Sequence, residues 1–232
     1  MKLFYTSLAL FLLLQTPALQ PRAAAEPVAL GIDPVKSTIV AVTSRAGLFS
    51  FVGHEHAILA NRWIGTIHLD PSDLKGSSAR FLIPVAALEI DSPEARKTAG
   101  LDAGPSPKDT DSLQETMLGP SVLDAKSYPQ ISFRSVSVET HDKKILLVKG
   151  ILTLHGVSKE VSSEITMAPA ENDTYRFSGV IPFKLSDFEI KPPSPNLFVK
   201  VGDDVKLIFE IYTKPQTGFA FGEKPTEPNS RS

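Results

Sequence analysis

The chain has 232 residues, of which 42% are hydrophobic, and carries 24 basic against 26 acidic residues, a formal net charge of −2. This length and apolar content predict one domain with a hydrophobic core. The near-neutral balance excludes the basic surface that a nucleic-acid-binding protein needs. The chain has no Cys, which excludes structural disulfides, so packing and sheet closure must supply the stability.

The first 25 residues have the pattern of a secretory signal peptide. Lys2 precedes an apolar run from Leu8 to Leu14, and Ala23 to Ala25 provide the small residues of a cleavage site. The run is shorter than the roughly 20 residues that span a membrane, so we expect no transmembrane segment in the mature chain. No Cys follows the run, which excludes a bacterial lipoprotein anchor. We therefore expect residues 1–25 to be removed and the protein to be periplasmic or secreted.

Short segments rich in β-branched and aromatic residues follow, separated by turn residues. This pattern favours an antiparallel sandwich or barrel. Pro84 lies in one of these segments, and because proline cannot donate a ladder hydrogen bond, we expect it at a sheet edge or a bulge. Eight such strands are predicted, over residues 37–44, 63–70, 79–85, 131–138, 145–154, 157–167, 175–183 and 205–213.

The middle of the chain interrupts this series of strands. Residues 94–99 and 108–118 are rich in helix formers and charge, and Gly119-Pro120 is a helix stop signal. We expect one or two short helices here, the second of them a lid over the sheet. The C-terminal residues 215–232 are polar and rich in proline, which is typical of a disordered tail. The folded domain is therefore expected over residues 26–214.

The strand predicted over residues 145–154 is apolar on both faces. Leu146 and Leu152 lie on one face, and Leu147 and Ile151 lie on the other. A strand with one solvated face alternates more cleanly than this. A helix or a partner covers the second face, or the aliphatic side chains are simply exposed, as many are on protein surfaces. If a partner covers the face, we expect a homodimer, formed through this face or through an open edge at Pro84.

Several ordered motifs resemble one known family. A turn at Tyr128-Pro129 starts a strand, and two apolar strands reverse direction at His155-Gly156. With three further segments, these stretches resemble the YceI-like family from about Gly31 to Thr213. The segments that carry the resemblance are Asp124–Phe133, Gly150–Val161, Ile32–Ser37, Phe183–Ile190 and Val201–Leu207.

The resemblance implies a fold and a function. The fold is an all-β, antiparallel, eight-stranded, lipocalin-like barrel, and the function is binding of a polyisoprenoid or acyl chain by an exported protein. Enzymatic activity and a cofactor are not part of the family picture. A barrel of about eight strands is wide enough to enclose one elongated ligand. Aromatic or aliphatic candidates to line the ligand site, each of which could instead be packed core, are Phe49, Phe51, Ile58, Trp63, Phe133, Leu152 and Phe183.

A Gly-His-Glu-His stretch that ends at His56 distinguishes this chain within the family. On a strand, His54 and His56 point to the same face, as paired imidazoles do when they bind one metal. The third ligand would be His68 or His155, and the spacing selects neither. A helical zinc-protease motif is excluded, because position 58 is Ile58 where that motif needs His. Together with a proline-rich insertion after Ser92, the stretch indicates a divergent subgroup.

The residues leave two classes of function open. The chain has no Gly-x-Ser-x-Gly elbow, no Cys nucleophile and no glycine-rich phosphate loop after a strand. The leading hypothesis is therefore an exported, non-enzymatic lipid carrier. The alternative is a metal-binding protein or metal-dependent enzyme that uses His54 and His56. A third use of these histidines is as a polar anchor for the head group of a ligand.

Overall fold

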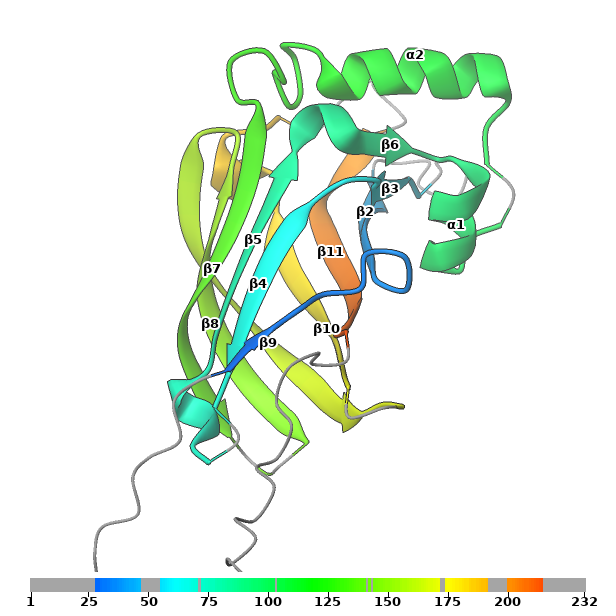
Figure 1. Ribbon diagram of the computed structural model, residues 1–232. Helices are drawn as coiled ribbons and strands as arrows, with labels where there is room; N and C mark the ends of the chain where they lie inside the picture. Colours follow the sequence, from blue (N-terminus) through cyan, green and yellow to red (C-terminus); the bar gives the residue numbers. More distant parts are fainter. Residues whose placement is uncertain are drawn as a thin grey trace, which may run out of the picture.

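The computed structural model is one antiparallel sheet that curls into a half-barrel, with two α-helices at one end (Figure 1). The structure describes residues 28–46, 55–70, 72–102, 104–140, 142, 144–171, 174–191 and 200–214. The predicted signal peptide and C-terminal tail lie outside these residues. The sheet order is β1-β4-β5-β7-β8-β9-β10-β11-β2-β3-β6. The strands are β1 (Val28–Leu30), β2 (Thr38–Ala46), β3 (Ala57–Ala60), β4 (Ile64–Leu69), β5 (Ser78–Pro84), β6 (Leu88–Ile90), β7 (Gln130–Thr140), β8 (Ile145–Leu154), β9 (Val157–Pro169), β10 (Tyr175–Lys184) and β11 (Lys200–Tyr212).

All eight predicted strands are present, and the all-β antiparallel class is confirmed. The number of strands is wrong, because the described sheet has eleven. The three additional strands, β1, β3 and β6, have only three or four residues each. Segments this short give no periodic pattern that can be separated from a loop.

Pro84 lies at an edge position, as predicted, because the ladder between β4 and β5 ends at Leu82 and Pro84 pairs only with β7; β5 as a whole is not an edge strand. β5 pairs with β4 on one side and with β7 on the other, so it is an interior strand. Pro84 is the last residue of β5, opposite Gln130, and the chain then enters the 3₁₀-helix η2 (Val85–Ala87). At this terminal position the missing N–H removes no further rung of the ladder.

Turn chemistry and alternation explain the long strands. β8 and β9 are joined at His155-Gly156, and both residues have positive φ (52° and 74°). Two such residues form the type of tight turn whose twist matches an antiparallel hairpin. Along β8 the even-numbered side chains are buried and face the interior. No described helix packs on the outer face of β8, where Leu147 and Ile151 remain half-buried.

The two ends of the sheet are held differently. Beyond β1, the chain pairs with the end of β11 through an Ile32–Thr213 bridge and a hydrogen bond from the Lys214 N–H to the Gly31 carbonyl (2.8 Å). At the other end, the backbone of β6 is bonded by one side chain. Gln114 accepts from the Ile90 N–H (2.9 Å) and donates to the Leu88 carbonyl (2.8 Å).

Both predicted helices form and begin at serine caps. In α1 (Pro93–Ala99) the Ser92 Oγ accepts from the Ala95 N–H at 3.1 Å, and α2 (Pro107–Leu118) begins in the same way at Ser106. α1 packs on β2 and β3, whereas α2 contacts β6 and lies across the top of the half-barrel in Figure 1. Neither described helix has the length and apolar character that crossing a membrane requires.

Candidate functional site

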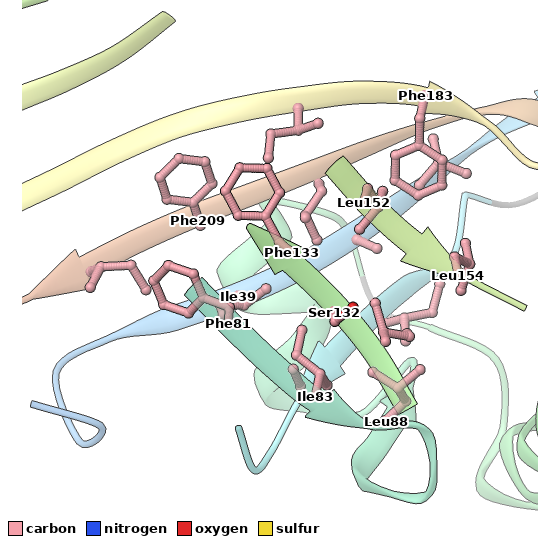
Figure 2. Close-up of a pocket in the computed structure, with 18 of the residues that line it drawn as sticks. Ile39, Phe81, Ile83, Leu88, Ser132, Phe133, Leu152, Leu154, Phe183 and Phe209 are labelled. Carbon is pink, nitrogen blue, oxygen red and sulfur yellow. The ribbon is translucent and has the colours of Figure 1, made fainter. Parts of the chain in front are cut away.

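The inner face of the sheet encloses a cavity of about 710 Å³. Strands from all sides of the curl contribute side chains to it, as the labelled residues of Figure 2 show. Forty described residues line the cavity, and none of these is Asp, Glu, Lys or Arg. The eight that carry polar side chains are Thr43, His56, Ser77, Ser78, Thr116, Ser121, Ser132 and Ser135. The space suits an apolar ligand of the size that protein pockets of about 300–1,000 Å³ hold.

Alternation along the long strands creates the apolar lining. In β8, Val148, Leu152 and Leu154 point inward and are at most 7% exposed. β10 and β11 contribute aromatic rings in the same way, among them Phe183 and Phe209. Successive side chains of a strand point to opposite faces, so one face of each strand supplies the whole lining.

Inward-facing glycines make room for three of the rings. A Cβ atom at Gly65 would lie 2.5 Å from Phe81, its cross-strand partner, and one at Gly179 would lie 2.9 Å from Phe209. A Cβ atom at Gly150 would clash with the ring of Phe133 in the same way. Each ring therefore lies over bare backbone, a pairing that also stabilises a glycine within a strand. Rings held against the wall leave space in the middle of the barrel.

The α2 end of the cavity is covered. Leu113 and Met117 of α2 and Val122 and Leu123 of the following turn belong to the lining. Met117 is 7% exposed although it lies on a short, polar helix. This arrangement agrees with the lid expected for the second helix.

The sequence-predicted ligand residues fall into three groups. Ile58, Phe133, Leu152 and Phe183 all line the cavity. Trp63 is not among the lining residues, and its ring packs at 5.8 Å from that of Phe81, which does line the cavity. Phe49 and Phe51 lie outside the described residues.

A buried polar cluster borders one corner of the cavity. The carboxylate of Asp91, at the end of β6, accepts from His56 Nδ1 (2.5 Å) and from Arg96 Nη1 (2.7 Å). Its Oδ1 also accepts from the Ala57 N–H at 3.0 Å. The Asp91 side chain is 0% exposed, and those of His56 and Arg96 are 13% and 9% exposed. Of these three side chains, that of His56 lines the cavity.

Hydrogen bonding keeps Asp91 ionised. Burial raises the pKa of its carboxyl, but the bonds from His56, Ala57 and Arg96 together lower the pKa below its usual value. An ionised carboxylate only accepts hydrogen bonds, so Nδ1 of His56 carries the proton in their bond. Arg96 is also bound to backbone, since Nη1 donates to the Glu55 carbonyl (3.0 Å) and Nε to the Asp102 carbonyl (2.5 Å).

The structure places His68 and His155 away from this corner. His54 lies outside the described residues. His68 is exposed on β4, and His155 packs on Tyr128 in the turn between β8 and β9, with ring centroids 4.3 Å apart. No group of three potential metal ligands of the His, Cys, Asp and Glu types occurs among the described residues. The two predicted candidates for a third ligand are therefore not brought to His56.

Sequence reasoning missed Asp91 and Arg96. They lie 35 and 40 positions beyond His56, and nothing in their spacing connects them to it. A local signal does exist, because Asp91-Ser92-Pro93 is a helix start that places a carboxylate just before the cap. Among the aromatic lining, Phe81, Phe177 and Phe209 were also missed, although alternation along their predicted strands would have found them.

Three comparisons place this geometry among known proteins. Residues 31–213 match the family model described as the YceI-like domain. A UPF0312 protein of Pseudomonas savastanoi pv. phaseolicola is 38% identical over 78 residues, which are 32% of this chain and 41% of that protein. The chain thus spans about two fifths of the length of the curated relatives it matches.

Two solved structures share the fold. Burkholderia cenocepacia BcnA superposes with a TM-score of 0.62 and 23% identity, covering 79% of this chain and 99% of that one. A polyisoprenoid binding domain from Saccharophagus degradans, implicated in plant cell wall breakdown, gives a TM-score of 0.54 and 10% identity, covering 82% and 99%. Identities this low establish a common fold.

Proposed function

The chain belongs to the YceI-like family, and from this membership and the geometry of its cavity we propose that it binds and carries one elongated apolar chain of the polyisoprenoid or fatty-acyl type. The cavity of about 710 Å³, whose described lining holds no Asp, Glu, Lys or Arg, carries this proposal. The polyisoprenoid binding domain from Saccharophagus degradans, which shares the fold, supports the choice of ligand class.

Because the lining is apolar, affinity for a ligand depends more on the length of its apolar chain than on polar contacts. Each methylene moved from water into the cavity contributes about 0.8 kcal/mol. Association and ordering of the chain oppose this gain, so a short ligand binds weakly and a long one tightly. A lining of this kind selects for apolar length and accepts related chains.

The carrier role is proposed for an exported protein without catalysis. The signal-like residues 1–25 support transport to the periplasm or the outside of the cell. The scarcity of ionisable groups supports a carrier, since His56 is the one such group in the described lining. General acid–base chemistry usually pairs groups that can hold and release protons within reach of one ligand. Cell fractionation, with detection of the mature N-terminus, tests the export.

Two neighbouring residues of β8 allow a matched test of lipid binding. Leu152 points into the cavity, and Ile151 points to the outer face of the same strand. We expect Leu152→Trp to fill the space and to lower affinity for an apolar fluorescent probe, N-phenyl-1-naphthylamine, by at least about tenfold, which corresponds to the burial of roughly two methylenes. Ile151→Trp adds the same side chain outside and should leave affinity unchanged.

Bound lipid gives the second readout. Organic extraction and mass spectrometry of protein purified from its native compartment should recover an isoprenoid or acyl chain from the wild type and from Ile151→Trp. The Leu152→Trp protein should yield much less. Wild-type protein that carries no chain and binds no apolar probe would overturn the proposed function.

A further inference from the structure

His56 is chemically exceptional in the cavity. It is the one ionisable side chain in the described lining, and its neighbours on the inner face are Thr43, Ile58 and Ile90. The backbone fixes its place, because the Thr43 N–H donates to the His56 carbonyl (3.0 Å) and the His56 N–H donates to Thr43 Oγ1 (3.2 Å).

The cluster behind His56 holds its ring in one orientation. Nδ1 donates to the ionised Asp91, whose second oxygen is held by Arg96 and the Ala57 N–H. Asp91 itself has a φ of 51°, in the left-handed region that most residues avoid. A strained backbone and a buried guanidinium thus hold one imidazole at the wall of an apolar cavity.

The other ring nitrogen is left for a ligand. Nε2 of His56 has no hydrogen-bond partner among the described residues, although the side chain is only 13% exposed. No buried side-chain nitrogen or oxygen among the described residues lacks a hydrogen-bond partner, so Nε2 keeps accessible surface. An accessible ring nitrogen beside an apolar cavity can bond to a polar group of a ligand. Thr43 adds a second group, because its hydroxyl oxygen accepts from His56 and its own hydrogen is not donated within the described structure.

From this geometry we infer that His56 and Thr43 form the head-group subsite of the cavity, and that the subsite takes the single hydroxyl group at the end of an otherwise apolar chain. The inference rests on the proposed function, and it names the class of ligand as a long-chain alcohol.

A hydroxyl group fits both protonation states of the ring. It donates to the lone pair of Nε2 when the imidazole is neutral, and it accepts from the N–H when the ring is protonated. In either case the oxygen can also accept from Thr43. A ketone lacks the donor that the neutral ring needs.

A phosphate or diphosphate head fits poorly. Such groups need several donors or cations at once. The described lining holds no Lys or Arg, and the Arg96 guanidinium, which donates to Asp91 and to the carbonyls of Glu55 and Asp102, does not line the cavity. Three other hydroxyl groups of the lining already form hydrogen bonds within the protein. Ser77 and Ser135 accept from backbone N–H groups, and Thr116 donates within α2.

Three C15 probes that differ at the head test the subsite. Farnesol carries the hydroxyl, farnesane carries no head, and farnesyl diphosphate carries the charged group. Each displaces N-phenyl-1-naphthylamine from the full-length mature protein in a competition titration. His56→Leu removes both ring nitrogens, and His68→Leu is the matched control, since His68 is exposed on β4 outside the cavity.

We expect His56→Leu to weaken farnesol binding about three- to tenfold, the ratio that one net hydrogen bond supplies. Farnesane binding should not weaken, and His68→Leu should change neither ligand. Thr43→Val should weaken farnesol in the same direction. Equal farnesol affinity in wild type and His56→Leu would overturn the inference, as would diphosphate binding that is tighter than farnesol binding and depends on His56.

A measurement on the unmodified protein covers the case in which His56→Leu does not fold. The ¹⁵N signal of His56 Nε2 should shift when farnesol is added and should stay in place with farnesane. An unmoved signal at saturating farnesol contradicts the inference. A stoichiometric metal ion lost with His56→Leu also contradicts it, because that result assigns Nε2 to the metal-binding alternative. If none of the probes binds wild-type protein, farnesane included, the proposed function itself fails.

Discussion

The wall formed by β7 to β11 and the corner where β3, β6 and α1 meet differ in how they are stabilised. The wall buries aliphatic and aromatic side chains such as Leu146, Leu152 and Ile211, each at most 4% exposed. The corner buries a carboxylate and a guanidinium beside an imidazole. The wall supplies most of the apolar lining, and the corner supplies His56, the one ionisable side chain in the described lining.

The two regions should also respond differently to mutation. Apolar contacts are non-directional, so one side chain of the wall can be exchanged for another of similar volume at modest cost. Buried ions depend on one another, because removal of one partner leaves the others without compensation. The corner is therefore the sensitive part of the molecule, although it contains few residues.

The largest expected effect is that of Asp91→Ala. This change leaves the Arg96 guanidinium buried without its carboxylate and puts alanine at a φ of 51°. We expect it to lower the free energy of unfolding by about 3–5 kcal/mol, as measured by urea denaturation. Asp204→Ala breaks the solvent-exposed pair with Lys184, at 2.6 Å, and should leave the free energy of unfolding close to that of the wild type. Equal losses in the two variants would contradict the contrast between corner and surface.

The wall has its own sensitive points where glycines lie under aromatic rings. Gly150→Ala forces the ring of Phe133 away from the backbone, and we expect a loss of about 1–3 kcal/mol from overpacking. The displaced ring should also reduce the affinity for N-phenyl-1-naphthylamine. In Gly31→Ala the new Cβ meets Lys214 at an ordinary 3.5 Å, so its melting temperature should stay close to that of the wild type. A Gly150→Ala protein with unchanged stability and binding would show that the ring has other room.

The same contrast decides how much the sequence could reveal. The eight long strands, of six or more residues each, follow from runs of β-branched, aromatic and aliphatic residues and from turn residues such as His155-Gly156, and these signals are local. The apolar lining follows from alternation along these strands, and Phe133, Leu152 and Phe183, predicted as aromatic or aliphatic candidates, are part of it.

The corner could not be predicted because its bonds are not local. β3 and β6 are too short to show a period, and they owe their structure to neighbours distant in the chain. The Asp91–His56 contact joins residues 35 positions apart, and only the folded sheet brings them together. The number of strands was underestimated for the same reason, since sheet pairing rather than propensity produces the short ones.

Lowering the pH should destabilise the polar corner before it destabilises the apolar wall. The pKa of Asp91 is lower in the folded protein than in the unfolded chain, so its contribution to stability is present above the unfolded pKa and is lost as the pH falls through the folded value. We expect a loss that begins below about pH 4 with a slope of at most about 1.4 kcal/mol per pH unit from this group. Asp91→Asn keeps a residue that tolerates positive φ and should flatten this part of the profile. Urea titrations at pH 3 to 7 measure both proteins, and an identical acid slope would assign the loss to other carboxylates.

The smallest effect separates the two helix caps. Ser92 Oγ accepts from the Ala95 N–H at 3.1 Å in a buried position next to Asp91, and it starts the helix that carries Arg96. Ser106 Oγ accepts from the Asp109 N–H at 3.4 Å in an exposed position on α2. We expect Ser92→Ala to cost about 1 kcal/mol and Ser106→Ala less, because solvent can replace the exposed bond. Thermal denaturation of both variants shows which of the two is less stable. If the Ser106 variant is the less stable, the position of α1 does not depend on its cap, and the ion cluster alone holds the corner together.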